Sequence, residues 1–430
     1  MPVTATEAGL LGPLSPTTDS TRSGPIATQA EVAAPDRGTR KRLDHIDAMR
    51  PVKQAGVVST HSLLAFAPVG TGISVGASLM LLHVTREAFL FVSACMLAYS
   101  FRGLQKINLV SFWQRRFALV GIPYLCWTVI YFFFTLPSSH GSLRSELIHL
   151  AYLSATGYYQ LYYLVVLLEF YAVFPLLLIL VRRTAGHHGR LLAVSGVVQL
   201  LVVSLMHWQV LPVWMRGFWA SREITSYQFY LVAGLVVAVH LDDVHRWLTE
   251  HVRFVVIFTI ATAALAELWY YLSAYQVLSW LGSDSDPFQP VVVPFNIGAI
   301  ASIYLIGVAL VHRHRSRRTR AIVTSGSDNS YGIYLAQTVF ITILGWLGWR
   351  HLNNVVPWPI VIAVSVALVF LASVALTALL ARTPLSRALT GRTRVPWRTP
   401  EPRPTPPDGS PLNVDADAPA ELVRTRVATS

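Results

Sequence analysis

The sequence predicts an all-α integral membrane protein, a single bundle of about ten transmembrane helices with both termini in the cytoplasm. Composition, the spacing of the apolar runs and the placement of Lys and Arg each predict it. Of the 430 residues, 53% are hydrophobic and only 13% are charged, whereas a soluble domain carries about 25% charged residues. Most of the chain therefore lacks the polar residues that a water-facing surface needs.

The apolar runs are spaced as spanning helices would be, and most approach the roughly 20 residues that a membrane helix requires. The second and sixth runs are short or interrupted, so their edges are less well defined than the others. The runs lie at about 48–67, 84–101, 116–136, 158–181, 191–211, 227–240, 254–273, 295–311, 330–348 and 358–381. No internal repeat is visible, so we expect one bundle whose helix contacts use small and occasional polar residues.

The positive charges test the orientation, because cytoplasmic loops are enriched in Lys and Arg. With the N-terminus inside, the inner loops are 102–115, 182–190, 241–253 and 312–329, and these carry far more Lys and Arg than the outer loops. The net charge of +12 is therefore explained by membrane topology. It does not form the basic domain with interleaved aromatics that nucleic-acid binding favours.

The chain divides into three parts by composition. Residues 1–43 are rich in Pro, Thr, Ser, Ala and Gly, which predicts a disordered cytoplasmic tail, and 383–430 form a second, Pro-rich tail. Residues 44–382 form the transmembrane domain. The two cysteines, Cys95 and Cys126, lie within apolar runs and have no metal-ligand or disulfide spacing, so we predict no metal site.

The first predicted helix, DHIDAMRPVKQAGVVSTHSLLAF, contains the best candidates for chemistry. Arg50 and His61 are eleven residues apart, so they share one helix face and are separated by about 16 Å along the axis. Arg50 lies near the cytoplasmic interface and His61 near the middle of the bilayer, where a titratable group is a functional candidate. A structural role for both residues is the alternative, with Asp47 as the ion-pair partner of Arg50.

Further arginines stand at the ends of the next two predicted helices. Arg115 and Arg116 begin the third, where they either anchor the helix at the cytoplasmic face or bind phosphate through their guanidinium forks. Arg86 stands beside Glu87 near the outer end of the second helix, against the charge rule. A structural ion pair and a substrate contact both explain it.

The stretch GYYQLYYLVVLLEFYAVFP, residues 157–175, is rich in tyrosine. Tyrosines at a membrane interface ordinarily form an anchoring belt, and we interpret the stretch in that way. Glu169 lies about halfway along this helix, and we expect it to face the interior of the bundle.

These segments, in this order, resemble the acyltransferase 3 family of membrane acyltransferases. The similarity runs from about residue 43 to about residue 381 and rests on several motifs together. The shared features are the Asp-x-x-Arg-x10-His signature of Asp47, Arg50 and His61, the segment TREAFLFVSACML, Arg115 and Arg116 with Pro123 downstream, Pro175 after the tyrosines, and NSYGIYLAQ at 329–337. Where many relatives have Gly or His, this chain has Ala94, Gln160 and Gln337, so no role is assigned to those positions.

The resemblance implies an O-acyltransferase that moves an acyl group, often acetyl, from cytosolic acyl-CoA to a hydroxyl. Acyl-CoA (acetyl-CoA) is then a co-substrate rather than a tightly bound cofactor, and the acceptor is a carbohydrate, a lipid or a secreted small molecule. We expect a multi-pass protein of the cell membrane that acts in the cell envelope. The resemblance also implies roles for Arg50 and His61 in catalysis and for Arg86, Arg115 and Arg116 in binding the donor.

Acyl transfer needs a base or a nucleophile, and both roles remain open for His61. His83, at the outer end of the second helix, is a weaker candidate. A transporter or flippase of a glycan or lipid intermediate is the alternative function, because intramembrane Arg, His and Glu also serve transport paths. A purely structural or sensor protein does not explain the ordered motifs.

Overall fold

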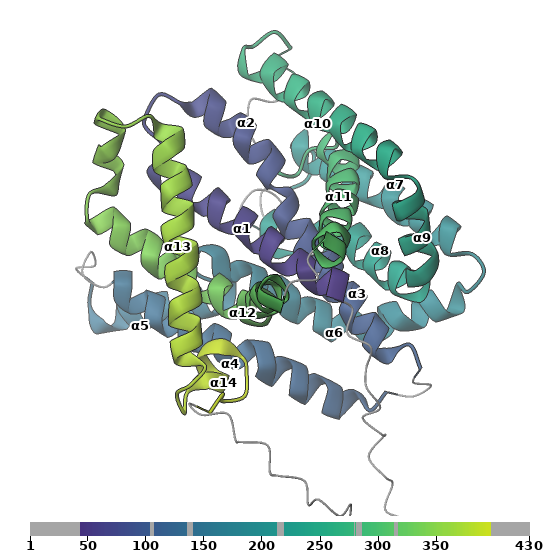
Figure 1. Cartoon of the computed structure of the whole chain (residues 1–430), viewed down its shortest axis with the longest axis horizontal. Coiled ribbons are helices and arrows are strands. Elements are labelled where there is room, and N and C mark those ends of the chain that lie inside the picture. Colours follow the sequence, from purple (N-terminus) through teal and green to yellow (C-terminus); the bar gives the residue numbers. More distant parts are fainter. Residues whose placement is uncertain are drawn as a thin grey trace, which may run out of the picture. The chain divides into compact units, whose positions relative to one another are not determined.

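The computed structural model describes residues 44–103, 107–135, 141–212, 219–278, 280, 286–313 and 317–396. These residues form helices and no strands (Figure 1). The α-helices are α1 Asp44–Phe66, α2 Gly72–Leu82, α3 Val84–Phe101, α4 Leu109–Thr135, α5 Leu143–Thr156, α6 Tyr162–Arg183, α7 His188–His207, α8 Gln228–Val239, α9 Leu241–Glu250, α10 Val252–Ala274, α11 Val292–Arg313, α12 Arg317–Trp346, α13 Trp358–Leu380 and α14 Ser386–Thr390. Short 3-10 helices lie at η2 Tyr159–Leu161, η4 Ala220–Arg222, η5 Ile224–Tyr227 and η7 Trp349–Asn354.

Every predicted apolar run falls on a helix, and the chain is an all-α membrane protein. Within the described ranges, seven helical segments are long and apolar enough to cross a membrane, and α8 with α9 makes an eighth if that pair, bent by 97°, is one span. Charged and polar side chains make α1 too polar to satisfy the same criterion. The number of spans and the side on which the termini lie stay predictions.

The structure differs from the predicted segments in three places: one segment begins earlier, and two helices form where a loop and a tail were predicted. The second segment begins at Gly72 rather than at residue 84, because α2 leads into α3. Helix α5 forms within a predicted outer loop. The tail predicted from residue 383 contains the packed helix α14, where the Trp127 indole N–H donates to the Leu389 carbonyl at 2.9 Å. The predicted tails at 1–43 and beyond 396 lie outside the described residues.

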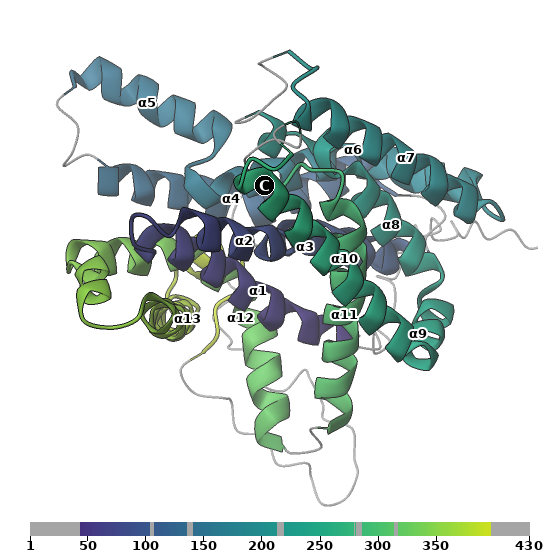
Figure 2. The same cartoon turned by 90° about the horizontal axis from the view of Figure 1, so that it is seen from above.

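Helix α1 occupies the centre of the bundle. It contacts α2, α3, α11, α12 and α13, and Figure 2 shows it surrounded by these elements. Such a position requires small residues at the crossings. At Gly56 of α1 a Cβ atom would lie 2.5 Å from Thr85 Cγ2 of α3, so only glycine allows this approach.

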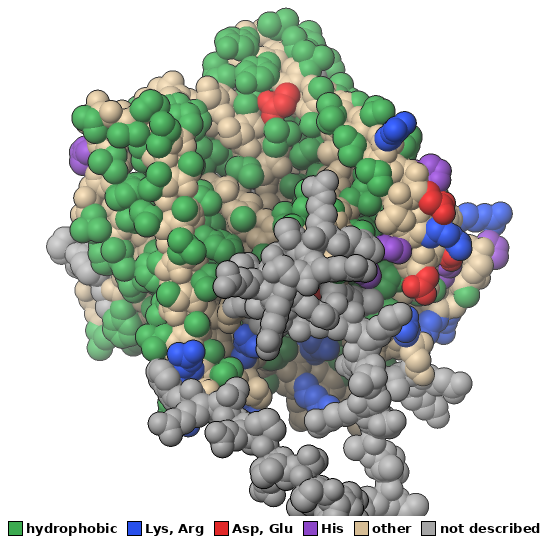
Figure 3. Space-filling model, in the orientation of Figure 1, with side chains coloured by type: hydrophobic (Ala, Val, Ile, Leu, Met, Phe, Trp, Pro, Cys, Tyr) green, Lys and Arg blue, Asp and Glu red, His purple; other side chains and the backbone are tan. Residues whose placement is uncertain are grey.

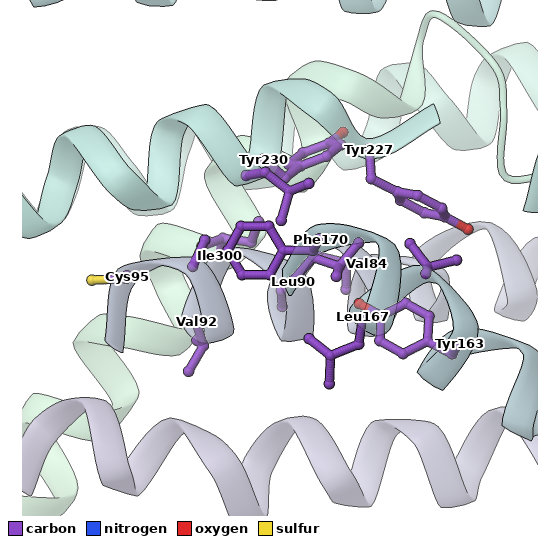
Figure 4. Packing of buried hydrophobic residues seen from close by; sticks show 14 of the residues in the cluster. Val84, Leu90, Val92, Cys95, Tyr163, Leu167, Phe170, Tyr227, Tyr230 and Ile300 are labelled. Atoms are coloured by element: carbon purple, nitrogen blue, oxygen red, sulfur yellow. The ribbon is translucent and has the colours of Figure 1, made fainter. Parts of the chain in front are cut away.

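The hydrophobic core lies between α3, α6 and α8. Phe170 of α6 and Leu90 of α3 are fully buried, and Tyr227 of η5 and Tyr230 of α8 lie close to them (Figure 4). The contact between α3 and α8 is close because Gly234 meets the backbone of Phe91, where a Cβ atom would lie 2.5 Å from the carbonyl oxygen. This packing fixes the first turns of α3 beside α6, which positions the site described below.

The outer faces of the helices are apolar. Large hydrophobic side chains of α6, α7, α10 and α13 are exposed, among them Leu176, Val197, Ile257 and Leu371. In Figure 3, hydrophobic side chains cover the upper left of the view, and Lys and Arg gather along its lower and right margins, toward α14 and α9. This distribution is that of a multi-pass membrane protein.

Candidate active site

His61 lies at a cavity of about 210 Å³ between α1, α3, α6 and α12. We call it the His61 cavity. Its walls combine aromatic rings with polar groups that converge from these four helices. The lining residues are Val57, Thr60, His61, Leu64, His83, Thr85, Arg86, Phe89, Tyr159, Gln160, Tyr162, Tyr163 and Tyr334. Residues predicted from separate segments of the sequence therefore meet in one place.

Two tyrosine hydroxyls hold the walls of the cavity together. Tyr163 of α6 donates to the backbone carbonyl of Arg86 in α3 at 2.6 Å. Tyr334 of α12 donates to the carbonyl of Gln160 in η2, just before α6. Each hydroxyl satisfies a buried backbone group, so the interhelical geometry around His61 is fixed by hydrogen bonds as well as by packing.

The imidazole of His61 has a hydrogen-bond partner at one of its two ring nitrogens. Its Nδ1 atom lies 3.1 Å from the Tyr159 hydroxyl, and the two ring centres are 4.9 Å apart. Within the described part of the chain, Nε2 has no hydrogen-bond partner. When Nδ1 carries the proton and donates it to Tyr159, Nε2 presents a free lone pair, which is the form that a general base or a nucleophile requires.

Tyr159 itself has a strained backbone. Its φ is +39°, and Gly157 two residues earlier has φ +81°. A bulky residue in the left-handed region is a rare outlier, and such strain concentrates at functional sites. Gly157 is required here, because a Cβ atom would lie 2.3 Å from the Tyr162 Cα. The turn thus presents the Tyr159 hydroxyl to His61 at an energetic cost that the surrounding structure must offset.

Arg86 lies in the His61 cavity as a buried cation. Its Nη2 is 3.8 Å from Glu87 Oε1, which is too long for a hydrogen bond. The buried Nε and Nη2 atoms of Arg86 and Oε2 of Glu87 have no hydrogen-bond partner. The Arg86 guanidinium also lies 5.4 Å from the centre of the Phe288 ring. Two nitrogens of this guanidinium, Nε and Nη2, are therefore left without a hydrogen-bond acceptor among the described residues.

A second group of cations lies nearer the start of α1. Arg50 pairs with Asp47 at 3.5 Å and is about one-third exposed. The Arg116 guanidinium of α4 lies 5.9 Å from the centre of the Tyr171 ring, and the Tyr171 hydroxyl interacts electrostatically with both Arg116 and Arg50. Tyr171 thereby joins cations from α1 and α4. We call Arg50, Arg116 and Tyr171 the cationic cluster.

The five predicted site residues divide into two groups. Arg86 lies with His61, and not with Arg115 and Arg116 as the resemblance had grouped them. Arg115 is exposed, and the structure gives it no partner among the described residues. Along α6 the two groups are marked by Tyr163 and Tyr171, which are eight residues and about 12 Å apart.

The sequence analysis did not single out several residues of this region, among them Tyr159 and Lys53. The sequence predicts Tyr159 to be part of an anchoring belt, whereas Gly157, two residues earlier, is a signal of the unusual turn that the structure shows. Lys53, one turn after Arg50, is buried, with its Nζ 3.8 Å from the centre of the Phe89 ring. Glu169 is half-buried and accepts the Ile224 backbone N–H at 2.9 Å, so its carboxylate ties α6 to η5 rather than lining the cavity.

A comparison with protein families identifies the family of the chain. The model of the acyltransferase 3 family, described as an acyltransferase domain, matches residues 44–378. The chain therefore belongs to this family and is a membrane acyltransferase. Neither the curated proteins nor the solved structures give a match to the sequence.

Proposed function

We propose that this protein transfers an acyl group, most simply acetyl, from cytosolic acyl-CoA to a hydroxyl of a carbohydrate, lipid or secreted small molecule. It would do so as a multi-pass protein of the cell membrane with both termini in the cytoplasm. The observation that carries the proposal is the His61 cavity, which is lined both by an imidazole with a free Nε2 and by Arg86, whose buried Nε and Nη2 atoms have no hydrogen-bond partner among the described residues.

The chemistry assigns complementary roles to these two side chains. Nε2 of His61 removes the proton from the acceptor hydroxyl, and the oxygen attacks the thioester carbonyl carbon. The carbonyl oxygen becomes an oxyanion, which the Arg86 guanidinium stabilises because it is buried and preorganised. When the C–S bond breaks, the thiolate of CoA receives the proton held by His61. In the covalent variant His61 first accepts the acyl group and then passes it to the hydroxyl.

The cationic cluster supports the choice of donor. Guanidinium groups match the geometry and charge of phosphate oxygens. Arg50, which like Arg116 interacts with Tyr171, precedes His61 on the same helix face by about 16 Å. The phosphates of CoA would bind at these arginines, and the extended pantetheine arm would carry the thioester toward the cavity. Arg86 would then contact the acyl end of the donor.

The test is acceptor-dependent release of CoA by the purified full-length protein in lipid nanodiscs. Labelled acetyl-CoA is supplied with hydroxyl-bearing acceptors, and free thiol and labelled product are measured together. We expect both in equal amount with the wild type, and neither with His61→Ala. His149→Ala is the matched control, because His149 is exposed on α5 and lies outside the cavity.

The same preparation separates the alternative function. A transporter or flippase reconstituted in vesicles would move a glycan or lipid substrate without consuming acyl-CoA. Substrate movement with no release of CoA would therefore contradict the proposal.

A further inference from the structure

Lys53 is a buried cation that the proposed reaction does not yet use. It lies in α1 and is 4% exposed. Among the described residues its ammonium makes no hydrogen bond and no ion pair, and its one contact of note is the Phe89 ring, 3.8 Å from Nζ to the ring centre. An ammonium in the interior of a membrane bundle is costly unless something balances its charge.

The neighbouring carboxylates do not balance it. Asp47 pairs with Arg50 at 3.5 Å, and Glu87 lies 3.8 Å from Arg86. Burial opposes the charged form of the Lys53 amine, and the positive charge of Arg50, one turn before it, opposes that form further. The cation–π contact with Phe89 offsets part of the cost of burial, but a neutral ring does not replace a counter-ion.

The position of Lys53 relates it to both groups of residues described above. Arg50, Lys53, Val57 and His61 follow one another at intervals of three and four residues, so they form one stripe along α1. Val57 and Phe89 both line the His61 cavity. Lys53 therefore lies between the cationic cluster and the cavity, eight residues and about 12 Å before His61.

We propose that Lys53 binds a phosphate group of the acyl donor and forms, with Arg50 and Arg116, a phosphate site whose deepest member is Lys53. This inference rests on the proposed function, because acyl-CoA supplies the phosphate. A bound phosphate balances the buried ammonium, and charge-assisted hydrogen bonds replace the missing partners. The uncharged pantetheine arm then continues along the α1 stripe, past Val57, to His61.

The variant Lys53→Met tests the proposal, because methionine keeps the flexible apolar stem and removes only the charge. Its thermal stability should equal or exceed that of the wild type, since an uncompensated buried charge is lost. Its affinity for acetyl-CoA, measured by calorimetry in nanodiscs, should fall about 10- to 100-fold, as expected for losing a contact between charged groups. Arg253→Met is the control, because Arg253 is exposed near the start of α10 and belongs to neither group of site residues, so its loss should change the affinity little.

A donor without phosphates makes the test specific. The KM for acetyl-pantetheine should be the same in the wild type and in Lys53→Met, whereas the KM for acetyl-CoA should be higher in Lys53→Met. An unchanged affinity for acetyl-CoA would overturn the proposal, and so would an equal loss for both donors. Nanodiscs with and without anionic lipid distinguish a second source of phosphate. Anionic lipid could raise the thermal stability of the wild type by supplying a phosphate to Lys53. If Lys53→Met loses this stabilisation but binds acetyl-CoA normally, the ligand of Lys53 is a lipid headgroup and the proposal fails.

The same assays separate this inference from the proposed function. A wild type that releases no thiol from either donor contradicts the proposed function itself. A wild type that turns over both donors, together with a Lys53→Met variant of normal affinity, contradicts only the phosphate site.

Discussion

The His61 cavity and the cationic cluster both hold positive charge, but they differ in how the protein surrounds it. In the cavity, Arg86 is buried, and tyrosine hydroxyls from α6 and α12 fix the backbone around it. In the cluster, Arg50 is about one-third exposed and Arg116 lies partly open beside Tyr171. A rigid, enclosed cation suits a charge that develops during a reaction, and open arginines suit an anion that arrives already charged. The difference indicates a division between chemistry and donor binding.

Apart from His61 itself, the largest effect on turnover is expected at Arg86. Replacing Arg86 by Met should lower kcat by about 10² to 10³, because one preorganised donor to the oxyanion is lost. The KM for acyl-CoA should change little. Arg102→Met, at the exposed far end of α3, should behave as the wild type in the same steady-state assay.

A double variant distinguishes this role from a structural ion pair. Arg86→Met leaves Glu87 buried without a partner, which itself destabilises the fold. Arg86→Met/Glu87→Gln removes both charges and should recover thermal stability while kcat stays low. If the double variant recovers activity together with stability, Arg86 is a structural residue, and the division between a chemical cavity and a donor-binding cluster is contradicted.

The next effect concerns the two adjacent arginines of α4. Replacing both by Ala should raise the KM for acyl-CoA about 10- to 100-fold, because charge-assisted contacts are lost. The structure places Arg116 beside Tyr171 and leaves Arg115 exposed, so Arg116→Ala should account for most of the change. Equal effects of the two single variants, or a defect in insertion alone, would make the pair a topological anchor.

A smaller effect is expected at Tyr159. Tyr159→Phe removes the hydrogen bond to Nδ1 of His61 and should lower kcat about two- to tenfold, the range of one neutral hydrogen bond. KM for the donor should not change. Tyr158→Phe is the matched control, since Tyr158 stacks on Tyr131 with ring centres 5.1 Å apart and does not line the cavity. Equal losses in the two variants would remove the special role of Tyr159.

Reporter fusions test the membrane orientation of the two regions and need no activity assay. They test which of the two regions faces the cytoplasm. Fusions after residues 185 and 318 should report the cytoplasm, and fusions after residues 145 and 285 the outside. An outside signal at 318 would reverse the orientation and place the cationic cluster away from cytosolic acyl-CoA.

The sequence predicted the helices well, because hydropathy over about 20 residues is a strong local signal. It also predicted the stripe that carries Arg50 and His61, since helical periodicity fixes which residues share a face. The sequence did not predict which side chains of different helices contact one another. The contact of His61 with Tyr159 joins residues 98 positions apart, and no local pattern encodes it. Helix α9 was missed for a related reason, because it is short and meets α8 at 97°.

The grouping of the arginines shows the same limit. Arg86 and Arg116 are each recognisable as charges at the end of an apolar run, but their distance from His61 depends on how α3, α4 and α6 rotate about their axes. The burial of Lys53 depends on the Phe89 ring of a neighbouring helix. Such contacts are set by packing at crossings such as that of Gly56 and Thr85, which a single sequence does not reveal.

The most direct test of the division is donor binding by a protein that cannot react. His61→Ala and wild type, both in nanodiscs, are titrated with acetyl-CoA by calorimetry, and each is then followed through a single turnover with acceptor present. We expect the same dissociation constant for both proteins and a transfer rate at least about 10² lower for His61→Ala, the lower end of the loss of general-base catalysis. A folded His61→Ala protein that transfers at more than about a tenth of the wild-type rate would contradict the account.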